Sequence, residues 1–301
     1  MNLDLFRLMV FVTVVDRDGY SAAARHLHLS QSTVSHHVGE LQKGLQSELL
    51  IYEQGAIHLT PAGHEVYRSA RLMLTEQESL GHALDDLKHG REGRVRLGAT
   101  LAFEQSYFML QAVAPFLRSH PQTMLSLRFG HSGATAQAVL DRQLDLGYVI
   151  KWQLPVDAHF ELLHTAELMF FVARDHPLAA QESVAPEEIM KVGLITAPAT
   201  SIESVFYLEK LRASGMSGDH SVLEVDGLQA RMLAAEAGLG VVATFVPKYA
   251  HLGALATALV PVRLDRPAGK AEIGLVRRVG DDESAPLSAL AAWLRKLSSE
   301  E

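Results

Sequence analysis

The chain has 301 residues, 48% of them apolar, and a formal net charge of −8 at pH 7. This length suffices for about two domains, because single hydrophobic cores stop growing well before that size. The absence of cysteine excludes a disulfide scaffold, a thiolate zinc site and a cysteine nucleophile. The N-terminus shows neither a basic targeting segment nor a spanning apolar stretch, so we expect a cytoplasmic protein without a membrane partner. The negative net charge argues only mildly against a nucleic-acid partner, since it describes the average surface.

The first 60 residues have the periodicity of short helices. The expected apolar stripe of the first helix consists of Leu5, Leu8, Val12 and Val15. Ser21 and Ser30 are expected to cap the second and third helices, since a serine hydroxyl can accept from the free N–H groups of a first turn. The connection between these helices, "HLS", is short, so the two must cross steeply. This geometry is typical of a helix-turn-helix.

The third predicted helix has an apolar and a polar face. The apolar positions are Val34, Val38, Leu41 and Leu45. The opposite face presents Ser32, His36, Gly39 and Lys43, with Gln31 at its N-terminal tip. The next segment, "LLIYEQGAIHLT", predicts two short strands around Gly55, which form a hairpin known as a wing. These residues alone fit either DNA binding or protein binding, and the excess of carboxylates over cationic side chains in residues 1 to 60 disfavours DNA.

A long helix is expected from Pro61 to about His89, ending at Gly90. Its apolar positions alternate in spacings of four and three residues and form a heptad seam: Val66, Ala70, Met73, Gln77, Leu80, Leu84 and Leu87. The strict repeat predicts pairing with the same helix of a second copy, in which Gln77 would fix the register. Packing within the chain, against the C-terminal domain, is the alternative.

The segment "GREGR", residues 90 to 94, predicts a hinge, and the pattern changes after it. Strand-like segments are "RVRLGAT", "MLSLRFG", "LDLGYVI", "ELMFFVA", "VGLIT", "SVLEVD", "GVVATF" and "EIGLVRR". Helices are expected at 105 to 119, 133 to 142, 202 to 214 and 227 to 237. This alternation predicts an α/β fold with a parallel or mixed sheet and helices on both faces, in one large domain or two similar lobes.

The stretch "FVTVVDRDGYSAAARHLHLSQSTVSHHVGELQKGLQSELL", followed by "LTPAG", resembles the N-terminal signature of the LysR-type transcriptional regulators. The intervals from Phe11 to Gly63 are preserved, and "DHPLA" and "GLGVVATFVP" extend the likeness over the C-terminal part. The resemblance implies a winged helix-turn-helix at 1–60, a dimerisation linker helix at 61–89 and a two-lobed α/β effector-binding domain at 90–301, like type 2 periplasmic binding proteins. Lobe I would hold about 92–150 plus 266–301, and lobe II about 160–260.

The resemblance further implies a transcription factor that binds double-stranded promoter DNA, responds to a small anionic metabolite and forms homodimers, commonly paired into homotetramers. Its DNA-contacting residues would be Ser21, Ser30, Gln31, Ser32, Thr33, Ser35, His36 and Lys43. The chain departs from the family pattern at Gln46 and Tyr52, where members usually carry glycine and arginine. The wing tip also lacks its usual basic residues, which puts phosphate contacts from the wing in doubt.

Turns between strands and helices predict the effector site. Ligands of open α/β sheets bind beyond the C-terminal ends of strands, where helix N-termini offer free N–H groups and favour anions. Thr100, Ser132, and Thr200 with Ser201 occupy such turns, and the family's pockets use matching positions. Leu101 and Phe245 complete the candidate set. The alternative is that these hydroxyls only cap helices.

Neither a metal site nor an active site is expected. His26, His28, His36 and His37 lie on two helices without a supporting carboxylate pattern, which argues against zinc. The sequence has no G-x-S-x-G motif, and "GLGVVA" lacks the third glycine of a dinucleotide site. We therefore expect a regulator without a cofactor. The alternative is a solute-binding module whose helical head contacts proteins instead of DNA.

Overall fold

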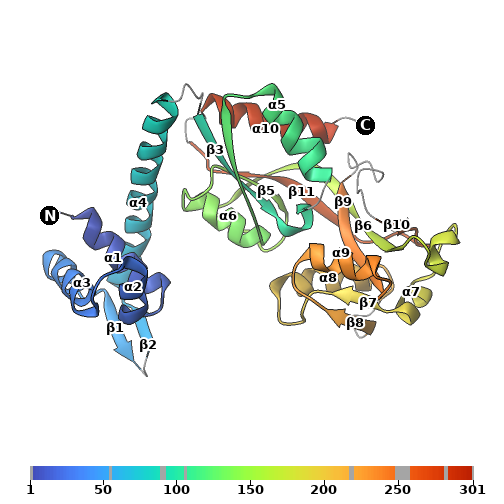
Figure 1. Cartoon of the computed structure of the whole chain (residues 1–301), viewed down its shortest axis with the longest axis horizontal. Coiled ribbons are helices and arrows are strands. Elements are labelled where there is room, and N and C mark those ends of the chain that lie inside the picture. Colours follow the sequence, from blue (N-terminus) through green and yellow to red (C-terminus); the bar gives the residue numbers. More distant parts are fainter. Residues whose placement is uncertain are drawn as a thin grey trace. The chain divides into compact units, whose positions relative to one another are not determined.

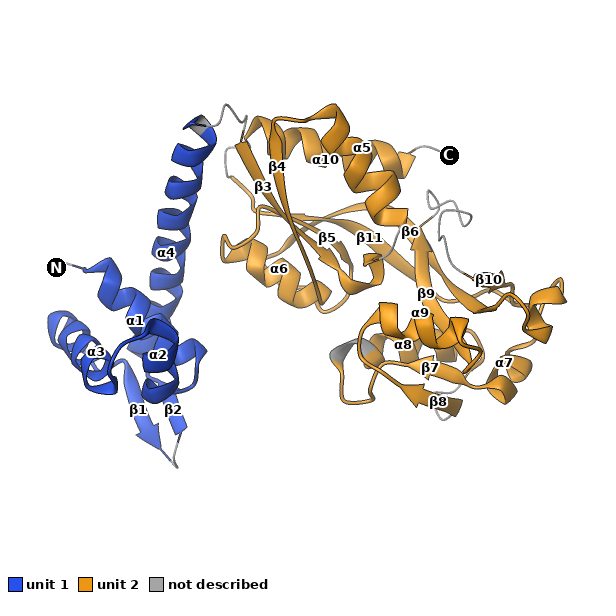
Figure 2. Ribbon diagram, viewed as in Figure 1, with its two compact units in different colours: residues 1–88 blue, residues 89–301 orange. Residues whose placement is uncertain are grey.

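The computed structural model describes residues 3–53, 56–88, 93–104, 107–216, 220–247, 258–280 and 284–299, with the side chains of residues 87, 202 and 203 excepted. The chain divides into two compact units, residues 1–88 and 89–301 (Figure 2). The predicted hinge at 90 to 94 lies mostly outside the described residues, as do residues 54 and 55 at the wing tip.

Unit 1 is a helix-turn-helix followed by a hairpin and a long helix, as predicted (Figure 1). Its elements are α1 (Leu5–Asp16), α2 (Tyr20–Leu27), α3 (Gln31–Leu45), β1 (Leu50–Glu53), β2 (Ala56–Leu59) and α4 (Pro61–Lys88). We call α1 to β2 the head. The predicted stripe of α1 is too narrow, because Val10, Phe11 and Val14 are buried beside Leu8 and Val12 while Leu5 is 40% exposed. The helix packs against α2, α3 and α4 at once, which requires a broader apolar face.

One of the two predicted helix caps is correct. The Ser30 hydroxyl accepts from the backbone N–H of Thr33 at 3.1 Å and caps α3. The prediction for Ser21 is wrong, because α2 begins one residue earlier, at Tyr20, and its N-cap is Gly19. The Gly19 carbonyl accepts the first helical bond, from the N–H of Ala23. Ser21 is thus an exposed residue of the first turn.

The segment from Thr60 to Gly63 connects the hairpin to α4. The Thr60 hydroxyl donates to the carbonyl of Glu48 at 2.7 Å and accepts from the N–H of Gly63 at 2.9 Å. A Cβ on Gly63 would lie 2.1 Å from the carbonyl oxygen of Leu49, so only glycine fits. These contacts explain why the "LTPAG" segment has a threonine at residue 60 and a glycine at residue 63.

Unit 2 contains one mixed sheet in the order β4-β3-β5-β11-β6-β9-β7-β8, with β10 paired to β6. The strands are β3 (Gly93–Thr100), β4 (Thr123–Gly130), β5 (Leu146–Ile150), β6 (His159–Ala173), β7 (Leu194–Thr196), β8 (Ser221–Glu224), β9 (Val241–Pro247), β10 (Leu259–Val262) and β11 (Lys270–Arg277). Strands β4, β3 and β5 are parallel, whereas β11 runs antiparallel to both β5 and β6. The prediction of a mixed sheet is confirmed.

Strand β6 connects the two halves of this sheet. Its N-terminal part pairs with β11, beside β5, and its C-terminal part pairs with β9 and β10. We therefore refer to the half that contains β3, β4, β5 and β11 as the first lobe, and to the half that contains β7 to β10 as the second. The sequence left one domain or two lobes open, and the structure shows two halves that share one strand (Figure 1).

Helices cover both faces of the first lobe's sheet, as predicted (Figure 1). On one face α6 packs against Val149 and Val276, and on the other α10 packs over Val95 and Leu97. The helical elements are η1 (Leu101–Phe103), the π-helix η2 (Phe108–Val113), α5 (Ala114–Ser119), α6 (Ser132–Leu140), η3 (Pro177–Ala180), α7 (Pro186–Val192), α8 (Ile202–Ala213), α9 (Leu228–Glu236) and α10 (Ala285–Ser299). The expected helix at 105 to 119 includes residues 105 and 106, which lie outside the described residues.

Candidate functional site

The exposed face of α3 carries the predicted DNA-contacting side chains. Gln31, Ser32, Ser35, His36 and Lys43 are all exposed, whereas Val34, Val38 and Leu41 are buried in the core of unit 1. At the N-terminus of α3 the Ser30 hydroxyl lies 2.8 Å from that of Ser32 and 2.7 Å from that of Thr33. A cluster of hydroxyls thus surrounds the free N–H groups of the first turn, a surface suited to a phosphate group.

Several cationic side chains of the head already have partners within the head. Arg7 and Lys43 both approach Glu40, at 3.8 and 3.9 Å, and Arg17 lies 3.2 Å from a ring nitrogen of His26. Lys43 is 82% exposed, so its pairing is weak in water. The cationic charge that this surface could offer to a phosphate is therefore partly compensated within the head itself.

The adjacent histidines of α3 differ in their surroundings. His36 is exposed, and its ring centroid lies 5.9 Å from that of His37. His37 is half-buried and meets the edge of Phe6 of α1 at 5.0 Å. His36 is thus available to a partner, whereas His37 contributes to packing between α1 and α3.

The apolar seam of α4 divides into two parts. Ala70 is 1% exposed inside the core of unit 1, and the partly buried Val66 packs against that core, so both side chains have apolar partners within one chain. The reason is that α1 packs along the N-terminal part of α4. Met73, Leu80 and Leu84 are 41%, 61% and 51% exposed, and Gln77 is exposed between them. The side chain of Leu87 lies outside the description.

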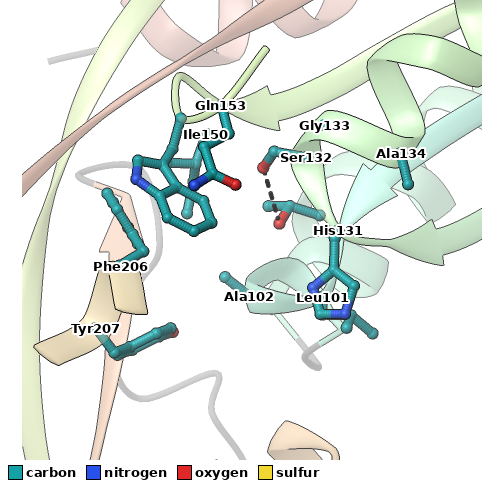
Figure 3. A pocket seen from close by; sticks show the side chains of 12 residues that line it. Leu101, Ala102, His131, Ser132, Gly133, Ala134, Ile150, Gln153, Phe206 and Tyr207 are labelled. Carbon is teal, nitrogen blue, oxygen red and sulfur yellow. Dashed lines mark hydrogen bonds between the residues drawn. The ribbon is translucent and has the colours of Figure 1, made fainter. Parts of the chain in front are cut away.

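A cavity of about 270 Å³ lies between the two lobes of unit 2. Four segments far apart in the sequence line it: Thr100, Leu101 and Ala102; His131, Ser132, Gly133 and Ala134; Ile150, Trp152 and Gln153; Phe206 and Tyr207. Figure 3 shows Phe206 and Tyr207 on the side opposite His131 and Ser132. The first and third segments begin with the last residues of β3 and β5, the second directly follows β4, and the fourth belongs to α8 of the second lobe.

Two of the predicted effector contacts meet in this cavity. Thr100 and Ser132 are 6% and 7% exposed, and the Ser132 hydroxyl donates to that of Thr100 at 3.3 Å, drawn as a dashed line in Figure 3. Within the described residues neither hydroxyl caps a helix. The capping alternative therefore does not apply to this pair.

The other predicted contacts occupy different places. Leu101 lines the cavity, but Thr200 and Ser201 are not among the described residues that do so. Thr200 is exposed, and the Ser201 hydroxyl accepts from the N–H of Ser204 at 3.2 Å, so it caps α8. Phe245 is fully buried behind the lining, with its ring 5.4 Å from Phe206 and 5.3 Å from Tyr207. It supports the wall and does not face the cavity.

Two family models match almost the whole chain. The model described as "Bacterial regulatory helix-turn-helix protein, lysR family" matches residues 5–64, and that described as "LysR substrate binding domain" matches residues 88–299. This chain belongs to the LysR family. It is a DNA-binding transcriptional regulator with a substrate-binding domain, and the family consists of regulators, which are not enzymes.

Individual LysR relatives are distant. The chain is 24% identical over 242 residues, 78% of its length and 76% of the relative's, to a "Probable RuBisCO transcriptional regulator" of Emiliania huxleyi. It is 26% identical over 196 residues, 64% of its length and 63% of the relative's, to the "HTH-type transcriptional activator CmpR" of Synechocystis sp.. The crystal structure of CbnR, a LysR family transcriptional regulator, superposes with a TM-score of 0.68 at 18% identity, over 99% of this chain and 100% of that one. This last likeness shows the shared fold.

Two departures from the LysR pattern have visible consequences. Gln46 follows α3 with a φ of 54°, in the left-handed region that favours the glycine usual here. Tyr52 on β1 is 73% exposed, in the place of the usual arginine. The wing itself is firmly attached, because the Gln42 amide oxygen accepts from the N–H groups of Leu49 and Leu50 at 2.7 and 3.2 Å.

Several residues that line the cavity of this LysR regulator were not predicted from the sequence. Trp152 follows the end of β5, so the strand-end rule that found Thr100 could have found it. Phe206 and Tyr207 lie within a helix, and no local signal distinguishes them from core residues. Gly133 approaches the loop after β5 so closely that a Cβ would lie 2.8 Å from the carbonyl oxygen of Gln153. Both Gly133 and Gln153 line the cavity.

Other kinds of site find little support in the described part of the chain. There, no three His, Cys, Asp or Glu side chains gather so that they could hold a metal ion. None of the helices described is both long and apolar enough to cross a membrane.

Proposed function

We propose that this LysR regulator acts in the cytoplasm as a homodimer or homotetramer whose DNA binding changes when a small molecule occupies the cavity between the lobes of unit 2. The observation that carries the proposal is the buried hydroxyl pair of Thr100 and Ser132, which meets Phe206 and Tyr207 of the other lobe across one cavity. A ligand there touches both lobes at once. It can therefore stabilise one arrangement of the lobes over another.

In this proposal the chain has three parts: a DNA-binding domain at 1–60, a linker helix at 61–89 and an effector-binding domain at 90–301. Gln31, Ser32, Ser35 and His36 contact base edges, and hydroxyls at the N-terminus of α3 contact phosphates. CbnR, also solved in complex with its target DNA, superposes with a TM-score of 0.68 and supports this use of the head. Met73, Gln77, Leu80 and Leu84 pair the linker helices of two copies.

The DNA-binding part is tested by selection from random duplexes with the full-length protein at low salt. We expect enrichment of a two-fold symmetric motif, because paired heads present two recognition helices. The variant Gln31→Ala with Ser35→Ala should lose that enrichment while remaining folded. A folded wild-type dimer that enriches no motif would contradict the proposal.

The effector part is tested with Thr100→Val and Ser132→Ala. Both variants should bind the selected duplex as the wild type does, but should lose the change in DNA binding that a cell extract's small-molecule fraction produces. Ser201→Ala is the control, because its hydroxyl caps α8 and is absent from the cavity lining. An unchanged response in both cavity variants would place the effector elsewhere.

A further inference from the structure

The cavity between the lobes has polar groups but few charges. Among the described residues that line it, none is lysine, arginine, aspartate or glutamate. Its polar groups belong to the side chains of Thr100, His131, Ser132, Gln153 and Tyr207 and to the indole N–H of Trp152. Because a buried charge without a partner is costly, a ligand with several charged groups would bind poorly here.

The donors of the cavity converge on one end. Helix α6 begins there at Ser132, and its first helical bond is donated by the N–H of Thr135 to the carbonyl of His131. The N–H groups of the preceding residues of the first turn are thus left for another acceptor. Since Ser132 donates to Thr100, the hydroxyl hydrogen of Thr100, a side chain only 6% exposed, can donate to a ligand. Several N–H and O–H donors at a helix N-terminus suit one carboxylate.

Flat apolar side chains form the other side of the cavity. The rings of Trp152 and Phe206 lie 5.3 Å apart at 44°, and Phe245 supports Phe206 from behind at 5.4 Å. Trp152 belongs to the first lobe and Phe206 to the second. A planar ligand ring can pack against both, and aromatic pairs attract each other beyond the burial of their area.

The size of the cavity limits the ligand. Its volume of about 270 Å³ is near the lower end of the range for small-molecule sites, which is about 300 to 1,000 Å³. The cavity therefore suits a small ligand.

We propose that the effector of this regulator is a small aromatic monocarboxylate. Its carboxylate accepts from Thr100 and from the N-terminus of α6, and its ring packs against Trp152 and Phe206. The inference rests on the proposed function of the cavity as the effector site. It disfavours amino acids, whose ammonium group meets no carboxylate in the described lining, and dicarboxylates, whose second charge would face the aromatic wall.

The test uses the fluorescence of Trp152. The chain has two tryptophans, and the other, Trp293 on α10, donates to the carbonyl of Ala112 away from the cavity lining. In full-length Trp293→Phe, benzoate should change the emission of Trp152 saturably. Cyclohexanecarboxylate, benzamide, succinate and L-phenylalanine should bind at least tenfold more weakly. Calorimetric titration of the wild type with the same probes replaces this measurement if Trp293→Phe fails to fold.

Two variants test the proposed pose. Thr100→Val should weaken benzoate binding at least tenfold. Thr123→Val, which removes an equally buried hydroxyl outside the cavity lining, should leave it unchanged. Benzoate binding no tighter than that of cyclohexanecarboxylate, equal affinity in Thr100→Val, or no saturable binding of benzoate would overturn the inference. Selection of a duplex motif by the same protein is independent of these results, so a regulator with another class of effector would be recognised as such.

Discussion

The head and the cavity of unit 2 offer similar donors in opposite surroundings. On α3, hydroxyls and free N–H groups lie on an exposed surface where water screens each contact, and Arg7 and Lys43 are already paired with Glu40. At α6 the same kinds of donors lie beside side chains less than a tenth exposed, where each one counts for more. The head must therefore multiply weak contacts over several copies, whereas one cavity in one copy suffices for its ligand.

The largest effect should come from separating the copies. The double variant Leu80→Glu with Leu84→Glu should be monomeric, because two negative charges replace apolar side chains in the exposed part of the seam. DNA affinity should then fall by about 100-fold or more, since paired heads bind through a high effective concentration. Binding of a cavity ligand should not change. Light scattering and fluorescence anisotropy measure the two effects, and His82→Glu on the same helix, outside the seam, is the control. A monomeric wild type at micromolar concentration would contradict the role of the seam.

A smaller effect is expected from His36, which we propose as the substitute for the head's missing cations. His36→Ala should cost about 1 to 3 kcal/mol of binding if it contacts a base. His36→Arg should bind at least as tightly as the wild type, because a guanidinium carries a permanent charge and can also donate to guanine. The expectation fails if His36→Ala and the wild type bind equally well, measured by anisotropy at fixed salt and pH.

The control for His36 is its neighbour. His37→Ala removes a half-buried ring that packs against Phe6, so it should lower the stability of the head more than its DNA recognition. Thermal unfolding and anisotropy on the same preparations separate these two effects.

Unit 2 contains a partly buried histidine, His164, that should make the stability of the fold depend on pH. Burial lowers the pKa of His164 to about 4, and its ring nitrogens contact Tyr148 and Ser298 at 3.3 and 2.9 Å. The unfolded chain binds a proton near pH 6.5 while the folded one does not, so the free energy of unfolding should decrease as pH falls from about 6.5 to about 4. For one proton the slope is at most about 1.4 kcal/mol per pH unit. In urea unfolding, the free energy of unfolding of His164→Gln should depend less steeply on pH than that of the wild type. The control His159→Gln, at an exposed residue, should show the wild-type dependence on pH.

The smallest effect concerns the backbone of the head. Gln46→Gly should stabilise unit 1 by roughly 1 kcal/mol, because a side chain at a φ of 54° is strained and glycine is not. Gln46→Ala keeps a Cβ in the left-handed region and should give no such gain. Neither variant should affect the cavity. Equal unfolding midpoints for the glycine and alanine variants would show that strain at this residue is negligible.

The sequence predicts the two regions unequally well for a physical reason. The face of α3 follows from the period of one helix, so its exposed residues could be named correctly. Thr100 and Ser132 follow from the ends of parallel strands. Phe206 and Tyr207 reach the cavity only because β6 carries the chain into the second lobe, and no local pattern contains that information. Ala70 fits the heptad spacing, but the spacing cannot tell α1 from a second copy as its partner.

The position of β11 sets an order for the synthesis of the protein. Residues 270–277 are made near the end of translation, yet β11 lies between β5 and β6 in the middle of the sheet. Until this strand leaves the ribosome, β5 and β6 have no partner between them, and their edges stay open to other chains. The residues of unit 1 need no later strand, so we expect the head to fold while unit 2 is still being made. A nascent chain cut off before residue 270 would have a folded head, but its sheet in unit 2 would lack the strand between β5 and β6.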